Sequence, residues 1–127
     1  MKAVLLDNGY LTDIRTAAAG AVAAKWLARA DATIAGIIGT GIQARLQLQA
    51  LTLVRPISRA IIWGRDPAKA ERLAEECRAA LGIETATART PGDLAAASDI
   101  IVTTTPSTEP LLDASALRPG QHITAMG

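Results

Sequence analysis

The sequence predicts an α/β fold in which a doubly wound, mostly parallel sheet is covered by helices on both faces, giving three layers. Three observations lead to this class. Strand-like and helix-like segments alternate along the chain, and the apolar run Thr33–Ile38 lacks alternation, as is typical of a parallel strand buried on both faces. A glycine-rich loop of the form G-x-G-x-x-A follows that run at once. Together these features indicate a Rossmann-type unit.

The first segment, residues 1–30, is expected to form a lead-in strand and helix. The apolar run Ala3–Leu6 ends in the turn-forming residues Asp7-Asn8-Gly9, which predicts a short strand. The alanine-rich stretch Thr16–Ala28 predicts a helix, because alanine has the highest helix propensity.

A strand–helix–strand unit is predicted next. Its first strand is Thr33–Ile38 and its helix is Ile42–Val54. That helix is expected to end before Arg55-Pro56, because the residue before a proline avoids helical backbone. Ser58–Trp63 is the second strand.

Asp66 and Pro67 predict a sharp helix start, with the aspartate as N-cap and the proline at the first helical position. The helix is expected to run to Leu81 and to end at Gly82. Cys77 falls on the apolar stripe of this helix, so we interpret it as a core residue rather than a reactive thiol.

The rest of the chain continues the alternation. Glu84–Ala88 predicts a weaker strand, Thr90 caps a further helix, and Asp99–Thr104 predicts another strand. Leu111–Leu117 predicts a short helix and Gln121–Met126 a final strand. The whole chain, residues 1–127, is thus expected to be a single domain.

Composition excludes several classes of protein. Half of the residues are apolar, with alanine at about a fifth of the chain, which suits close packing of helices on a sheet. A formal net charge of +1 gives no reason to expect nucleic acid or an anionic membrane as partner. A single cysteine cannot form an internal disulfide, so we expect a cytoplasmic protein. The sequence carries no cluster of metal-ligand residues, and no metal is expected.

The loop Gly39–Ala44 carries the clearest functional signal. Gly39 permits the tight turn off the strand, Gly41 lets backbone approach a pyrophosphate, and Ala44 is small where helix meets sheet. Amides at the start of the helix would then face the phosphates with a favourable dipole. We therefore predict dinucleotide binding, against the alternative of a merely tight turn.

The end of the second strand bears on the choice of cofactor. An NAD enzyme usually has Asp or Glu there to accept hydrogen bonds from the adenosine ribose, but this chain has Gly64. Arg65 could stack on adenine or pair with a 2′-phosphate. Asp66 could serve the ribose, although its role as helix N-cap is the better interpretation. We expect NAD(P), and favour NADP(H) over NAD(H).

Other candidates are less specific. Thr103, Thr104 and Thr105 could border the nicotinamide ribose, or could simply reflect strand propensity before Pro106. By composition alone Arg15 is better interpreted as a solvated side chain than as a carboxylate or phosphate ligand. The sole histidine, His122, is interpreted as an ordinary hydrogen-bonded residue, and the two tryptophans, Trp26 and Trp63, as packing residues.

Several separated motifs resemble the ornithine cyclodeaminase/mu-crystallin family. The matching segments are Leu5-Leu6-Asp7-Asn8-Gly9-Tyr10-Leu11-Thr12, Ile14-Arg15-Thr16-Ala17-Ala18-Ala19, Gly39-Thr40-Gly41-Ile42-Gln43-Ala44, Trp63-Gly64-Arg65-Asp66-Pro67, Thr103-Thr104-Thr105-Pro106-Ser107 and His122-Ile123-Thr124-Ala125-Met126-Gly127. In these segments the residues are most similar to those of bacterial members, including those linked to ectoine utilisation. The resemblance spans essentially the whole chain.

The resemblance implies a function and an assembly. Family members are homodimers that join a Rossmann domain to a second domain built from both chain ends. They transfer hydride at a carbon–nitrogen bond next to a carboxylate, so an amino-acid or imino-acid substrate is implied. The main hypothesis is an NAD(P)-dependent imine reductase or cyclodeaminase. The alternatives are a non-catalytic NADPH-binding or small-ligand-binding protein of the mu-crystallin type, or an inactive fragment.

The resemblance also assigns residues. It makes Arg15 a ligand of the cofactor phosphates and the substrate carboxylate, which reverses the interpretation from composition. The family's catalytic aspartate would follow Gly127, and the second domain is largely missing, so no catalytic residue is expected here and the chain is not expected to turn over alone. The predicted cofactor-binding residues are Arg15, Thr16, Gly39, Thr40, Gly41, Ile42, Gln43, Gly64, Arg65, Asp66, Thr103, Thr104, Thr105, Met126 and Gly127.

Overall fold

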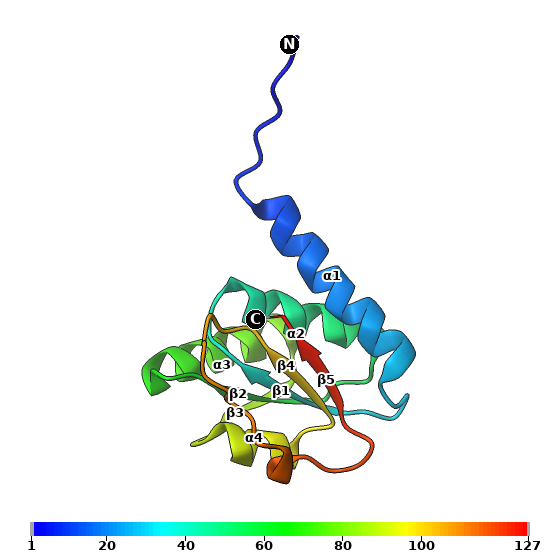
Figure 1. Cartoon of the computed structure of the whole chain (residues 1–127), viewed down its shortest axis with the longest axis vertical. Helices are drawn as coiled ribbons and strands as arrows, with labels where there is room; N and C mark the ends of the chain where they lie inside the picture. The colour runs from blue at the N-terminus through cyan, green and yellow to red at the C-terminus, as the bar shows by residue number, and fades with distance from the viewer. Residues whose placement is uncertain (1, 127) are drawn as a thin grey trace.

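The computed structural model, which describes residues 2–126, has a parallel five-stranded sheet between two layers of helices (Figure 1). This confirms the predicted α/β class. The elements in chain order are α1 (Tyr10–Leu27), β1 (Ile34–Ile38), α2 (Ile42–Val54), β2 (Arg59–Trp63), α3 (Pro67–Leu81), β3 (Glu84–Thr87), α4 (Pro91–Ala97), β4 (Ile100–Thr103), the 3₁₀ turn η1 (Ala114–Ala116) and β5 (His122–Ala125).

The strand order is β3-β2-β1-β4-β5, and every neighbouring pair is parallel. The chain winds outward from β1 to β3, then crosses back to β4 on the other side of β1. In sheets of this kind the ligand crevice lies at the carboxyl ends of the strands, where the winding direction changes. The topology therefore directs attention to the segments that follow β1 and β4.

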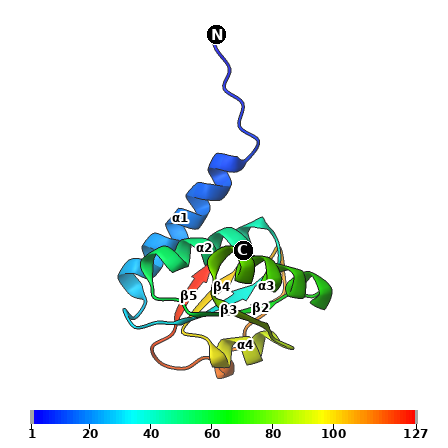
Figure 2. The same cartoon turned by 180° about the vertical axis from the view of Figure 1, so that it is seen from behind.

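Helices α1, α2 and α3 lie on one side of the sheet, and α4 with η1 lies on the other (Figure 2). Each side has its own buried cluster, which explains why β1 is apolar along its whole length. Alanines at the contacts of α2 and α3 with the sheet, such as Ala44, Ala70 and Ala74, allow close approach. Cys77 belongs to this larger cluster, as predicted, and burial raises the pKa of its thiol.

The predicted strand at Ala3–Leu6 is wrong. Residues 2–8 have no regular secondary structure and extend away from the sheet, with Leu5 97% exposed (Figure 1). A strand needs a neighbouring strand for its backbone hydrogen bonds. The edge strands of this sheet are β3 and β5, and neither pairs with residues 2–8. The first helix also begins earlier than predicted, at Tyr10 after the left-handed Gly9.

The predicted helix at Leu111–Leu117 is also wrong, since only a single 3₁₀ turn forms there. Asp113 caps this turn by accepting a hydrogen bond from the Ser115 amide at 2.8 Å. Leu111 and Leu117 pack instead against the smaller buried cluster.

Helix capping follows the sequence closely. The Asp66 carboxylate accepts a hydrogen bond from the Ala68 amide at 3.0 Å, and the Thr90 hydroxyl accepts one from the Asp93 amide at 3.0 Å. Gly82 ends α3 in the left-handed conformation, with φ of 66°. Each of these ends was predicted from residue type, because capping is a local interaction.

Asp99 ties together the amino ends of the strands, opposite the expected ligand edge. Its carboxylate accepts hydrogen bonds from the Thr33 and Ile34 amides, both at 3.0 Å, and contacts Arg29 at 3.1 Å and Arg118 at 3.4 Å. Burial by itself would raise the pKa of this carboxyl, but the backbone hydrogen bonds and the two guanidinium groups outweigh it and lower the pKa below its ordinary value.

We expect Asp99→Ala to lower the free energy of unfolding by about 3 kcal/mol, because two amides and two arginines lose a partly buried acceptor. Urea denaturation at neutral pH measures this. Asp31→Ala is the matched control, because Asp31 pairs with the same Arg29 but its side chain is 83% exposed. We expect Asp31→Ala to leave the free energy of unfolding almost unchanged.

The effect has a definite pH dependence. Since folding lowers the pKa of Asp99, its contribution is complete above the ordinary carboxyl pKa and is lost as the pH falls through the folded value. The difference between wild type and Asp99→Ala should therefore shrink in acid. Equal stability of Asp99→Ala and Asp31→Ala at neutral pH would contradict this account.

Candidate functional site

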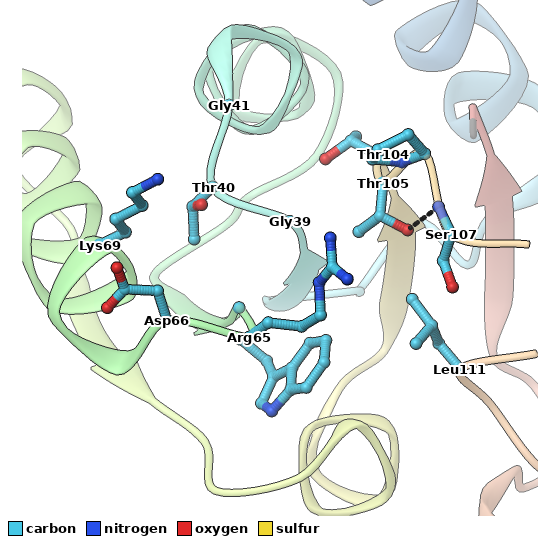
Figure 3. A pocket seen from close by; sticks show the side chains of 13 residues that line it. Gly39, Thr40, Gly41, Arg65, Asp66, Lys69, Thr104, Thr105, Ser107 and Leu111 are labelled. Carbon is cyan, nitrogen blue, oxygen red and sulfur yellow. Dashed lines mark hydrogen bonds between the residues drawn. The ribbon is translucent and has the colours of Figure 1, made fainter. Parts of the chain in front are cut away.

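A cleft of about 540 Å³ lies at the carboxyl ends of β1, β2 and β4, where the topology places a ligand crevice (Figure 3). Its walls come from three separate connections: the loop after β1, the start of α3, and the loop after β4. The lining residues are Gly39, Thr40, Gly41, Trp63, Gly64, Arg65, Asp66, Lys69, Thr104, Thr105, Pro106, Ser107 and Leu111.

Gly39 makes the turn that opens the cleft. Its φ is 129°, a value that side-chain-bearing residues rarely adopt, and its amide donates to the carbonyl of Trp63 at 2.8 Å. A Cβ atom here would collide with the Thr104 hydroxyl and lie 2.9 Å from the Thr104 carbonyl oxygen. Gly39 is therefore required by the protein itself, whether or not a ligand is bound.

Gly41, in contrast, is not required by the protein itself. It is the N-cap of α2 with extended backbone, which any residue can adopt, and a Cβ atom there would meet no protein atom within 4 Å. No side chain caps this helix start, unlike the starts of α3 and α4. Gly41 itself lines the cleft, so the uncapped start of α2 borders the cleft, an arrangement that suits an anion.

Gly64 lies across the cleft from this loop, at the end of β2. A Cβ atom at this position would collide with the Thr40 methyl group. An acidic side chain is therefore excluded from the place where NAD enzymes usually carry one, unless Thr40 moves. The loop after β1 and the end of β2 fit together through this contact.

Arg65 and Asp66 follow on the same wall. The guanidinium of Arg65 points into the cleft in Figure 3 and is exposed. One carboxylate oxygen of Asp66 already accepts the hydrogen bond that caps α3. This confirms the capping interpretation, and it leaves Arg65 as a charged group that points into the cleft.

The opposite wall is the loop after β4. The Thr104 hydroxyl donates to the carbonyl of Ile38 at 3.2 Å, which fixes the ends of β1 and β4 together. The Thr105 hydroxyl accepts from the Ser107 amide at 3.4 Å (Figure 3). Thr103 lies outside this cleft and lines a neighbouring hollow of about 310 Å³ with Ile123.

Four predicted residues on α1 and α2 do not line the cleft. Arg15 is exposed on α1, and Ile42 is 53% exposed at the start of α2. The Gln43 side chain turns toward α1, where it donates to the carbonyl and carboxylate oxygens of Asp13 at 3.1 and 3.2 Å. The Thr16 carbonyl accepts a hydrogen bond from Gln47 at 3.1 Å. Their contact with a cofactor stays a prediction.

Two predicted residues lie at the carboxyl end of the described chain. Met126 donates its amide to the carbonyl of Thr103 at 2.9 Å and packs against the larger buried cluster, without lining the cleft. Gly127 lies outside the described residues.

Sequence reasoning missed the cleft roles of Trp63 and Lys69. Trp63 packs against the smaller buried cluster, as expected, but it also lines the cleft, and its indole N–H donates to the Arg89 carbonyl at 3.2 Å. Lys69 is the third residue of α3, and its place in the first turn, directly after the Asp66-Pro67 helix start, is the signal in the sequence that could have indicated it. Trp26, in contrast, is not a packing residue, since it is 76% exposed.

His122 forms a hydrogen-bond contact with the Thr124 hydroxyl at 3.0 Å, as an ordinary structural histidine would. Burial, together with the nearby Arg55 charge, lowers its pKa. Between residues 2 and 126 there is no group of three or more His, Cys, Asp or Glu side chains that could hold a metal ion. In the same span no helix has the length and apolar character needed to cross a membrane.

A sequence model of the ornithine cyclodeaminase/mu-crystallin family matches residues 1–127, the entire chain. The chain belongs to this family. The match confirms the resemblance drawn from the separated motifs, and the Rossmann-like fold of family members accounts for the parallel sheet and the cleft at its carboxyl edge.

Several known proteins are similar to this chain. A putative dehydrogenase of Rhizobium meliloti is 58% identical over 127 residues, which are 100% of this chain and 39% of that protein. The Δ1-pyrroline-2-carboxylate reductase of Thermococcus litoralis, solved with NADH and L-proline, has a TM-score of 0.89 and 42% identity over 92% of this chain and 36% of that one. The iminosuccinate reductase of Paracoccus denitrificans, solved with NAD⁺, has a TM-score of 0.85 and 38% identity over 94% and 37%.

The chain therefore spans less than two-fifths of the length of these three similar proteins.

Proposed function

We propose that this chain is the NAD(P)-binding domain of an ornithine cyclodeaminase-like oxidoreductase that transfers hydride at a carbon–nitrogen bond next to a carboxylate. One observation carries the proposal: Gly41, the N-cap of a helix that no side chain caps, lines the cleft, and a side chain there would meet only open space. Two relatives of the same fold are imine reductases solved with NADH or NAD⁺, which supports this use of the cleft.

The residues present fit a dinucleotide. The amides from Thr40 to Gln43 would hold the diphosphate, because they combine free donors with the positive end of the α2 dipole. Gly64–Asp66 would border the adenosine ribose, and Thr104 and Thr105 the nicotinamide side. The cofactor supplies the hydride chemistry when bound, and the part played by this chain is to bind and orient it.

We favour NADP(H) over NAD(H). Thr40 blocks the position of the usual acid at Gly64, and Asp66 is engaged as a helix cap, so the ribose hydroxyls lack a free carboxylate. Arg65 offers a guanidinium that is suited to a phosphate.

The substrate class follows from the relatives. An amino acid or imino acid is proposed, because the two imine reductases act on compounds of this kind. Arg15 is proposed to bind the substrate carboxylate, since its guanidinium is exposed and makes no ion pair within residues 2–126. We further propose that residues 1–127 form one domain of a homodimeric cytoplasmic protein whose second domain completes the substrate site.

Calorimetric titration of the chain with NADPH and NADH tests the proposal. We expect saturable binding of at least one cofactor with a single site, and tighter binding of NADPH. Absence of heat with both cofactors at millimolar concentration would contradict the assignment of the cleft. Tighter binding of NADH would leave the cleft in place and overturn only the cofactor preference.

A further inference from the structure

We propose that Lys69 acts with Arg65 as a two-cation seat for the 2′-phosphate of NADP(H), which makes Lys69 a specificity-determining residue of this site. The inference rests on the proposed function. It adds a residue that the sequence motifs did not indicate, and it places the 2′-phosphate between α3 and Thr40, at the edge of the diphosphate loop.

Lys69 stands where two cavities meet. It lines the main cleft, and it also lines an adjoining hollow of about 360 Å³ between α2 and α3 that shares Thr40 and Gly41 with the cleft. In Figure 3 its ammonium group points toward the loop that carries Thr40, while Arg65 approaches from the other side of that residue. A group attached to a ribose at the end of β2 would lie between these two cations.

Both cations are available for a ligand. Within residues 2–126, neither Arg65 nor Lys69 has an acidic partner within 4 Å. Asp66 lies between them in the sequence, but one of its oxygens is engaged by the Ala68 amide at 3.0 Å. Two like charges on one wall repel each other, and a phosphate dianion would relieve this repulsion.

Arg72 is the natural comparison. It lines the adjoining hollow, one turn further along α3, but it does not line the cleft. Like Lys69, it has no acidic partner within 4 Å among residues 2–126, so the two cations differ in whether they line the cleft. Removing Arg72 therefore changes the net charge of α3 by the same amount as removing Lys69, without removing a cation from the cleft.

The test is calorimetric binding of NADPH and NADH to the wild-type chain and to Lys69→Ala, Lys69→Arg and Arg72→Ala. We expect Lys69→Ala to weaken NADPH binding about tenfold and to change NADH binding less than about twofold. Lys69→Arg should retain most of the NADPH affinity, because the charge is kept. Arg72→Ala should change both affinities less than about twofold.

Three results would overturn the proposal. Equal weakening of NADPH and NADH in Lys69→Ala would make Lys69 a general contact rather than a specificity residue. If Lys69→Ala and Arg72→Ala lost the same NADPH affinity, the effect would come from the net charge of α3 and not from a cation in the cleft. Wild-type binding of NADH at least as tight as NADPH would remove the phosphate seat while the proposed function stands, whereas binding of neither cofactor would end both.

Discussion

Gly41→Val should weaken NADPH binding at least about 100-fold, equivalent to about 2.7 kcal/mol, while leaving the chain folded. The valine side chain would project into the open space in front of the first amides of α2, which is where the diphosphate is proposed to lie. Since the backbone of Gly41 is extended, with φ of −85° and ψ of −170°, valine can adopt it without strain. The loss would thus fall on the ligand and not on the fold.

Calorimetry with NADPH measures the affinity, and urea denaturation measures the stability of the same sample. The free energy of unfolding should fall by no more than about 1 kcal/mol, because valine is a poorer N-cap than glycine. Gly41→Ala provides a graded step, with an intermediate loss of affinity. Unchanged NADPH affinity in the valine variant would remove the assignment of the diphosphate to this loop.

Gly39→Ala, unlike Gly41→Val, should lower the stability of the fold itself. Positive φ for a residue with a side chain costs about 1–3 kcal/mol, and overpacking costs about 1–3 kcal/mol more. The collision is with the backbone carbonyl of Thr104 as well as its side chain, and Thr104 is held to Ile38 by hydrogen bonds from its amide and its hydroxyl. We expect the free energy of unfolding of Gly39→Ala to be lower than that of the wild type by about 3 kcal/mol.

Thermal unfolding followed by circular dichroism should show a midpoint lower by roughly 10 °C. Gly82→Ala is the matched control: its φ is also positive, at 66°, but a Cβ atom there would meet nothing within 4 Å. Its loss should be about 1 kcal/mol, the cost of left-handed backbone alone. If Gly39→Ala were no worse than Gly82→Ala, the proposed crowding between β1 and β4 would be wrong.

The predictable parts of the fold are those set by local chemistry. Asp66 with Pro67 and Thr90 with Pro91 begin helices in the structure as they do in the sequence, because a cap involves only neighbouring backbone. The apolar strand β1 and the loop after it were likewise clear, since burial on both faces leaves an unbroken apolar run.

The features that could not be predicted depend on distant partners. Ala3–Leu6 has a strand-like composition, but whether a strand forms is decided by the presence of a neighbouring strand. The Gln43 side chain turns to Asp13 because α1 packs beside α2, and these two residues are 30 positions apart in the sequence. Gly64 could be noted as an unusual residue at its position, but only the fold shows that the Thr40 methyl group occupies the space of its side chain.

At the cleft, some lining residues could be predicted from the sequence and others could not. The residues Gly39–Gly41, Gly64–Asp66, Thr104 and Thr105 line one cleft, because parallel strands end at a common edge and the residues after them converge there. Trp63 and Lys69 were missed because each has an ordinary structural interpretation in sequence, one as a strand residue and the other as a solvated helix residue.

The central claim is that the first amides of α2 bind the diphosphate of the cofactor, and it is tested most directly by following backbone amide resonances during titration with NADPH. The account predicts the largest shifts at Thr40–Gln43, with smaller shifts at Gly64–Asp66 and at Thr104 and Thr105. Shifts confined to the apolar groove between α1 and α2, which Val22 and Leu53 line, with none at Thr40–Gln43, would contradict it.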